Sequence, residues 1–449
     1  MNEVTCYHSI NTFLDNVRQF DVCDNPFESY AFLSVYLKYH PKGDFYFFDV
    51  FEDGKKIAII PFECTYQSKL LNVKKFRFIG YRQFNYEQFI CKEEDTARVF
   101  DIFTDYLKNQ KYHVVLNYYD INDSSVFYKV LDEAPLKQSR NKLYLCPCLH
   151  FTTDFESFFK EVYPSSKKRT ELRKFQKRLD EIGTFRILTI DDEDTYVQNE
   201  KYVNQIYRVH AERFADVYAT SFFGSEKQRP YYSDLIESLM KGKKGYLSLL
   251  LMDDVVIAFV FCLTNGRTLI DWIPAFDPAY AKYSLGIVQY KMMFEMLCSE
   301  GSGYEVFDYS KGSSVYKRKW AKQETANYQF IINLSPRSLP AQVLYWFDKN
   351  KFAFKVYLRN KGVLGKVKHI LGKLIKRKPE ENNHKAVINY QDASPLTNYK
   401  FEYRSILNLS VKDREQIISS IYQGYKVESI EESNGLTTVN MCKNSGEKK

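Results

Sequence analysis

The sequence predicts an α+β protein in which mixed, mostly antiparallel sheets are flanked by helices. The main evidence is the stretch 245–320, where turns separate three strand-like runs that precede a loop, a helix and a fourth strand; the runs are 246–251, 255–263, 268–276 and 304–309, and the helix spans 287 to about 299. A second observation is an internal sequence similarity, the internal echo: 46–62 aligns with 246–262, and both segments contain an acidic turn followed by Ile-Ala.

The first half is predicted to contain a helix, a hairpin, a strand, a helix and a strand. Asn25-Pro26 begins a helix over 27–39, since proline is favoured in the first helical turn. Asp53-Gly54 is the turn of the hairpin. The later elements are expected at 75–80, 96–109 and 113–119. The aromatic segment 81–89 does not open a helix with glycine, so we place the chemistry in the second half.

A basic helix links the two halves over 165–183, with Ser165 as its N-cap. Leu172, Phe175, Leu179 and Ile182 share one face. The other faces carry Lys167, Lys168, Arg169, Arg173, Lys174, Lys177 and Arg178. We interpret this charge as a solvated face, with a phosphorylated acceptor or an acidic lipid surface as the alternative partner. RNA is not favoured, because aromatic residues do not interleave with the basic ones.

The loop 277–286 is the candidate binding loop, because it leads directly into the helix that begins at Ile287. A helix N-terminus offers unpaired N–H groups and partial positive charge, which suits a pyrophosphate. Gly286 allows close approach of the ligand to the backbone, and Lys282 adds charge. An ordinary connection between a strand and a helix would look similar, so the residues that follow must decide.

Those residues carry a family resemblance. Phe307-Asp308-Tyr309-Ser310-Lys311-Gly312, followed by Tyr316-Lys317-Arg318-Lys319-Trp320, resembles the end of the CelD/BcsL-type acetyltransferase domain of the GNAT superfamily, which is related to the FemAB peptidyltransferases. The upstream His210-Ala211-Glu212-Arg213-Phe214 and the basic helix 166–183 match in the same order along the chain. The resemblance covers about residues 25–345.

The resemblance implies two tandem GNAT-like domains, and the internal echo agrees with it. We expect an N-terminal GNAT-like domain at 1–150, a catalytic one at 151–345, a basic amphipathic helical segment at 346–378, and a linker, small appendage and polar tail at 379–449. The C-terminal extension is thus expected to be helical. The implied reaction moves an acyl group, most simply acetyl, from acyl-CoA to an amine. Resemblance alone suggests an amine on a sugar or nucleotide-sugar of bacterial surface polysaccharide assembly.

Composition sets further bounds. With 45% hydrophobic and 27% charged residues, the chain has the profile of a soluble globular protein. Its nine cysteines are scattered and complete no zinc pattern, so we expect no metal, no disulfide framework and a cytoplasmic location. We see no signal peptide at the N-terminus. The net charge of +8 suits a phosphate-bearing ligand or an anionic membrane.

The basic stretch 363–377 spaces its apolar residues as a helix does, with lysines between them. Such a helix can lie on an anionic membrane or dock its apolar stripe on the core, and we favour docking. The protein would then be cytoplasmic, with at most a peripheral contact at the inner face of the membrane.

Acyl transfer of the GNAT kind needs a strand that holds the thioester and a base that takes a proton from the amine. The strand would be 268–276, in which Pro274 predicts a break or bulge. The predicted donor-binding residues are Trp272, Ile273, Lys282, Tyr283, Ser284, Leu285 and Gly286. His210 and Asp271 are both candidate bases, and each could instead be structural. Tyr316 could return a proton to the thiolate or simply pack.

The partner is expected to be a small amine or sugar acceptor, without nucleic acid. Its predicted contacts are Arg213, Asp308, Lys311, Lys317 and Lys319. Three alternatives stay open: a FemAB-like aminoacyltransferase that uses aminoacyl-tRNA, a non-catalytic GNAT-like binding module, and a peripheral membrane scaffold. The basic helix fits the first of these, but the long helical arm expected between its halves is missing.

Overall fold

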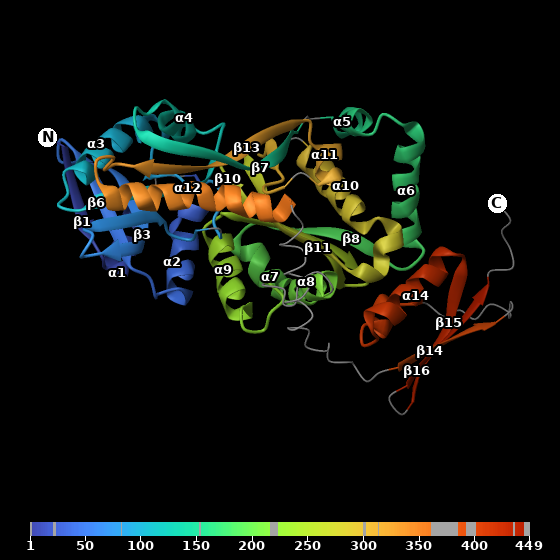
Figure 1. Ribbon diagram of the computed structural model, residues 1–449. Helices are drawn as coiled ribbons and strands as arrows, with labels where there is room; N and C mark the ends of the chain where they lie inside the picture. The colour runs from blue at the N-terminus through green and yellow to red at the C-terminus, as the bar shows by residue number, and fades with distance from the viewer. Residues whose placement is uncertain are drawn as a thin grey trace.

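A computed structural model describes residues 2–20, 24–81, 83–151, 154–215, 223–299, 302–312, 314–360, 385–391, 401–433 and 436–443. One large mixed sheet of 13 strands runs through the first 333 residues, and helices cover both of its faces (Figure 1). Its strand order is β1-β2-β3-β4-β6-β13-β7-β12-β11-β10-β9-β8, and β5 pairs with β3.

The first half supplies one end of this sheet. Its strands are β1 (Asn2–Tyr7), β2 (Phe45–Glu52), β3 (Lys55–Ser68), β4 (Val73–Phe78), β5 (Ile90–Cys91), β6 (His113–Asn122) and β7 (Lys137–His150). Its helices are α1 (Ile10–Gln19), η1 (Pro26–Glu28), α2 (Tyr30–Tyr39), η2 (Glu93–Asp95), α3 (Thr96–Lys108) and α4 (Val126–Glu133). The predicted helix at 27–39 is therefore a short 3₁₀ turn followed by α2, each begun by a side-chain cap.

The second half supplies the other end. Its strands are β8 (Phe185–Ile190), β9 (Gly245–Met252), β10 (Val255–Asn265), β11 (Thr268–Phe276), β12 (Val306–Asp308) and β13 (Gln323–Asn333). Its helices are α5 (Phe155–Val162), α6 (Ser166–Asp180), α7 (Glu193–Val203), α8 (Ile206–Phe214), α9 (Arg229–Lys241), η3 (Pro278–Tyr283), α10 (Leu285–Leu297) and α11 (Val315–Trp320). None of the described helices is both long and apolar enough to cross a bilayer.

The two halves repeat one pattern. In each, an antiparallel hairpin precedes a strand, a helix, and then a strand parallel to the one before the helix: β4 pairs with β6, and β11 with β12. The hairpin turns match in detail, since Asp53 and Gly54, like Asp253 and Asp254, all have positive φ. Two-residue turns of that kind follow the twist of the strands they join.

The halves also exchange their last strands. β7, which belongs to the first half in sequence, pairs with β12 of the second, and β13 of the second half pairs with β6 of the first. β7 and β13 pair with each other at the centre of the sheet. The predicted boundary at residue 150 therefore falls at the end of a strand whose partners both lie in the other half.

The hydrophobic core is shared between the halves on one face of the sheet. Phe27 and Phe32 from the first half lie 6.2 and 5.8 Å, ring to ring, from Trp272 of the second. Leu249, Phe259 and the buried side of α9 join the same cluster. On the opposite face, α3 and α4 cover the first half, and α5 and α10 cover the second.

The expectation of a helical C-terminal extension is corrected by the structure. After α12 (Leu339–Asn360), the chain forms a separate three-stranded sheet of order β14-β16-β15, built from β14 (Lys385–Gln391), β15 (Tyr425–Ser433) and β16 (Leu436–Lys443). It is accompanied by η4 (Tyr403–Ile406) and α14 (Val411–Tyr422) (Figure 1). These elements form the C-terminal module. Its strands place apolar residues such as Ile388, Val427 and Val439 against its core, as in a half-buried sheet. The helix predicted at 363–377 lies outside the described residues.

Candidate functional site

The site lies where two parallel strands part. β11 and β12 pair only from Thr268↔Val306 to Ile270↔Asp308, yet β11 continues to Phe276 while β12 ends. Past Ile270, this edge of β11 is no longer covered by β12. β11 also contains a bulge at Trp272, because Asp271 pairs with Cys262 and Ile273 with Phe261. The irregularity predicted from Pro274 is therefore present, two residues earlier in the chain.

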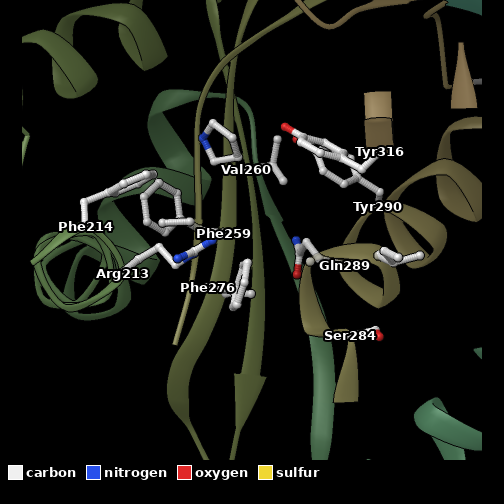
Figure 2. A pocket seen from close by; sticks show the side chains of 14 residues that line it. Arg213, Phe214, Phe259, Val260, Phe276, Ser284, Gln289, Tyr290 and Tyr316 are labelled. Atoms are coloured by element: carbon white, nitrogen blue, oxygen red, sulfur yellow. The ribbon is translucent and has the colours of Figure 1, made fainter. Parts of the chain in front are cut away.

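A cavity of about 400 Å³ opens at this edge (Figure 2). Its wall is formed by Arg213, Phe214, Ala258, Phe259, Val260, Pro274, Ala275, Phe276, Ser284, Gly286, Ile287, Gln289, Tyr290 and Tyr316. Residues of β10 and β11 lie between the end of α8 on one side and the start of α10 on the other. The wall is mostly apolar, with a few polar groups that could orient a ligand.

The N-terminus of α10 faces this cavity. Ser284, at the cap position, has a φ of 51°, and no side chain caps the helix. The first N–H groups of a helix have no partner within it, so they can donate hydrogen bonds to a bound anion. Both Ser284 and Gly286 line the cavity. A Cβ at Gly286 would lie 3.3 Å from the ring of Phe276, so a larger side chain would press into the cavity.

The other predicted donor residues lie elsewhere. Lys282 donates a hydrogen bond to Ser419 of α14. Tyr283 and Leu285 are buried, and the Tyr283 ring lies 5.1 Å from that of Tyr422. The side chains of Trp272 and Ile273 pack in the core shared by the two halves. Of the residues predicted to bind the acyl donor, Ser284 and Gly286 are therefore the two that line the cavity.

Asp271 is buried directly behind the cavity. Tyr290 Oη donates a 2.7 Å hydrogen bond to Asp271 Oδ2, and within the described residues Oδ1 has no hydrogen-bond partner. Burial raises the pKa of the Asp271 carboxyl to about 6, while the charge of Lys317 and the bond from Tyr290 act in the opposite direction. A carboxyl with such a pKa can exchange a proton near neutral pH.

Two tyrosines stand between Asp271 and the cavity. Tyr290 from α10 and Tyr316 from α11 both line the wall, with ring centroids 6.2 Å apart and nearly parallel planes. Burial raises the pKa of both hydroxyls above the ordinary tyrosine range, so both are neutral donors at neutral pH. Tyr290 was not predicted. It is one of 36 tyrosines, and nothing local marks it.

His210 lies on α8 among aromatic rings, 4.6 Å from Phe214 and 5.1 Å from Phe223 between ring centroids. Burial lowers the pKa of His210 to about 4, so the imidazole is neutral at physiological pH. It is not among the residues that line the cavity. Arg213, one turn further along, does line it, with its guanidinium 4.5 Å from the ring centre of Phe276.

Apart from Arg213, the predicted acceptor-binding residues lie from the end of β12 to α11, where the two halves meet. Asp308 accepts a 2.6 Å hydrogen bond from Tyr86, and burial raises the pKa of the Asp308 carboxyl. Lys311 forms an ion pair of 3.0 Å with the fully buried Asp120. Lys317 donates to the carbonyls of Tyr309 and Lys311, at 2.6 and 3.0 Å. Lys319 is exposed. Lys311 and Lys317 therefore have partners within the chain.

The aromatic segment 81–89 meets the loop between β12 and α11. Besides the bond from Tyr86, Asn85 Nδ2 donates to Ser310 Oγ at 2.9 Å. Contacts between residues more than 200 positions apart therefore fix the loop that precedes Tyr316. No group of three or more His, Cys, Asp or Glu side chains suited to a metal gathers within the described part of the chain.

Comparison with known families identifies the second half. Residues 166–318 match the family described as acetyltransferase (GNAT) domain. The chain therefore carries a GNAT domain of the CelD/BcsL type. The resemblance predicted from the order of the motifs is confirmed. The GNAT domain contains every residue that lines the cavity, and of the predicted site residues only Lys319 lies beyond it.

No curated protein matches the chain. Similar solved structures include FemX, 10% identical with a TM-score of 0.49 over 76% of this chain and 100% of that one. The C-terminal domain of a putative lysylphosphatidylglycerol synthetase from Agrobacterium fabrum is 13% identical, with a TM-score of 0.46 over 74% and 95%. A tandem GNAT protein from the clavulanic acid biosynthesis pathway is 7% identical, with a TM-score of 0.39 over 75% and 99%. Likenesses this distant carry no information about substrate.

Proposed function

We propose that the chain is an N-acyltransferase that moves an acyl group from acyl-CoA to an amine in the cavity at the edge of β11. The observation that carries the proposal is the buried Asp271, hydrogen bonded to Tyr290 at the cavity wall. A GNAT domain in general implies an acyl-CoA donor. A carboxyl behind a neutral tyrosine supplies the proton acceptor that the reaction of an amine with a thioester requires.

The donor would lie along the uncovered edge of β11. Backbone groups beyond Ile270 would bind the amide groups of the pantetheine arm, as a neighbouring strand does. The start of α10, at Ser284 and Gly286, would receive the pyrophosphate, because it offers N–H groups without a capping side chain. Arg213 would add positive charge from the opposite wall.

The reaction is then a direct substitution at the thioester carbonyl. The amine nitrogen forms the new C–N bond, and the C–S bond breaks. The amine proton passes to Tyr290 Oη as the tyrosine's own proton moves to the Asp271 carboxylate along their hydrogen bond. Tyr316 donates its proton to the leaving thiolate, and the proton held by Asp271 returns through Tyr290 to restore Tyr316. One amide and one thiol result, with no net proton change.

The acceptor we propose is an amine on a sugar or nucleotide-sugar of bacterial surface polysaccharide assembly. Its support is the family resemblance; of the predicted acceptor residues, Arg213 lines the cavity. As predicted from the sequence, the reaction would take place in the cytoplasm.

The test is an acyl-transfer assay with the purified full-length chain. Acetyl-CoA and longer acyl-CoAs are incubated with a panel of amino-sugars and nucleotide amino-sugars, and thiol release and product mass are followed. We expect amide formation that Tyr290→Phe slows by roughly 100-fold or more. Tyr304→Phe, which alters a tyrosine outside the cavity wall, should preserve it. Absence of acyl-CoA binding by calorimetry would overturn the proposal, and transfer from aminoacyl-tRNA instead would identify the FemAB-like alternative.

A further inference from the structure

α12 presents apolar residues on two opposite faces. Its inner face packs on the large sheet: Ala341 and Tyr345 are buried against Val73 of β4, Val115 of β6 and Ile331 of β13. Asp348 lies on the same face and forms an ion pair of 2.9 Å with Lys75 of β4. The inner face alone accounts for the position of α12, which crosses the sheet over the first half in Figure 1.

On the described part of α12, the outer face is apolar and exposed. Val343, Trp346, Phe347 and Phe354 are 55%, 60%, 63% and 62% exposed. At 100° per residue these positions lie about 100° to 180° around the helix from Ala341 and Tyr345. The rings of Trp346 and Phe347 are in contact, with centroids 5.8 Å apart. Single exposed apolar residues are ordinary, but a cluster of three such side chains within two turns, with a fourth further along the same helix, marks a candidate interaction surface.

Positive charge is concentrated along the same part of the chain. Residues 349–378 contain eleven basic side chains and no Asp or Glu: Lys349, Lys351, Lys355, Arg359, Lys361, Lys366, Lys368, Lys373, Lys376, Arg377 and Lys378. The net charge of the whole chain is only +8, so the remainder is slightly negative. Four of these residues, Lys349, Lys351, Lys355 and Arg359, belong to α12 itself, so this helix suits an anionic partner.

We propose that the outer face of α12 binds an anionic lipid bilayer. Tryptophan and phenylalanine favour the boundary between headgroups and acyl chains, and adjacent lysines and arginines bind acidic headgroups. The cluster and the charge are consecutive in sequence, as a surface-bound segment requires. This inference is independent of the acyl-transfer reaction. The docking predicted for 363–377 concerns residues outside the described part of the chain and stays a prediction.

The test uses co-sedimentation with vesicles. The full-length chain is mixed with vesicles of phosphatidylcholine alone, or of equal parts phosphatidylcholine and phosphatidylglycerol. We expect sedimentation only with the second, reduced at least tenfold in the double variant Trp346→Ser, Phe347→Ser and weakened by salt or by Lys349→Glu with Lys351→Glu. Val197→Ser, which alters an exposed apolar residue of α7, is the control and should leave binding unchanged.

Tryptophan fluorescence gives a second readout. The chain has three tryptophans, and Trp346 is exposed whereas Trp320 is buried and Trp272 half-buried. Anionic vesicles should shift the emission to the blue, and Trp346→Phe should remove the shift while sedimentation persists. Unchanged sedimentation of the double variant would overturn the proposal. The proposal would also be overturned if the protein bound neither kind of vesicle and instead formed a dimer that the double variant dissociates.

Discussion

The guanidinium of Arg414 lies 2.7 Å from the carboxylate of Asp277, and the two side chains are 1% and 0% exposed. Arg414 belongs to α14 of the C-terminal module, and Asp277 begins the loop that leads into α10. Tyr403 donates a further hydrogen bond to Asp277, and Glu212 of α8 pairs with Arg414 at 2.7 Å. The C-terminal module therefore holds the loop and the helix whose N-terminus faces the cavity.

Removing Arg414 should destabilise the protein. Arg414→Ala leaves Arg208, at 3.4 Å, as the cation beside the buried Asp277, together with the hydrogen bond from Tyr403. Breaking a buried ion pair on one side costs about 3–5 kcal/mol, and Arg208 should keep the loss near the lower value. Urea unfolding measures it. Arg404→Ala, an exposed arginine of the same module, is the control, and an equal loss in both variants would contradict a special role for the buried pair.

Catalysis should depend on the pair formed by Asp271 and Tyr290. Asp271→Asn and Tyr290→Phe each remove the proton path while keeping the shape of the site. We expect kcat to fall by roughly 100-fold or more, with little change in the KM for acyl-CoA. Steady-state kinetics with purified variants measures this. Asp49→Asn in the first half should keep kcat, and full activity in both site variants would exclude this pair.

The pH dependence separates the two candidate bases. The pKa of Asp271 is raised to about 6, whereas that of His210 is lowered to about 4. If Asp271 accepts the proton, kcat should decline below about pH 6, by roughly tenfold per pH unit. A decline that begins only near pH 4, and that His210→Ala removes, would assign the base to His210 instead.

Asp271 should also make stability depend on pH. Its folded pKa of about 6 lies above the ordinary value of 3.8, so the protonated form is favoured in the folded state. Its contribution to stability is present below about pH 4 and is lost as the pH rises to 6. The free energy of unfolding of Asp271→Asn, measured relative to the unchanged protein, should therefore be larger at pH 8 than at pH 4, by up to about 3 kcal/mol. Unfolding curves at the two pH values measure the difference; no difference would mean that Asp271 is better solvated than its burial indicates.

The size of the side chain at position 286 should determine how tightly acyl-CoA binds. A Cβ there would lie 3.3 Å from the ring of Phe276. We expect Gly286→Ala to weaken acyl-CoA binding slightly and Gly286→Val by tenfold or more, as titration calorimetry would measure. The graded pair is its own control, and equal affinities would remove this helix start from the donor site. Lys282→Glu should act on the C-terminal module instead, because Lys282 bonds Ser419.

Much of the local structure could be predicted from the sequence. The hairpin at Asp253-Asp254, the helix after the loop 277–286 and the short last strand all follow from periodicity and turn chemistry. Asp271 lies on the strand after that hairpin, Gly286 lies at the start of that helix, and Tyr316 follows the last strand. Their roles in catalysis and binding stay predictions. The sheet of the C-terminal module was not predicted. The basic apolar segment before it has helical spacing, and its own short strands carry a weak signal.

Other features were decided by contacts between distant residues. The exchange of β7 and β13, the bond from Tyr86 to Asp308 and the burial of Arg414 against Asp277 each join segments far apart in the chain. Turns and helices are set by interactions over a few residues, so their patterns can be read in order. Which strand pairs with which, and which carboxyl loses water, depend on the free energy of packing the whole sheet, and that exists only once the chain has folded.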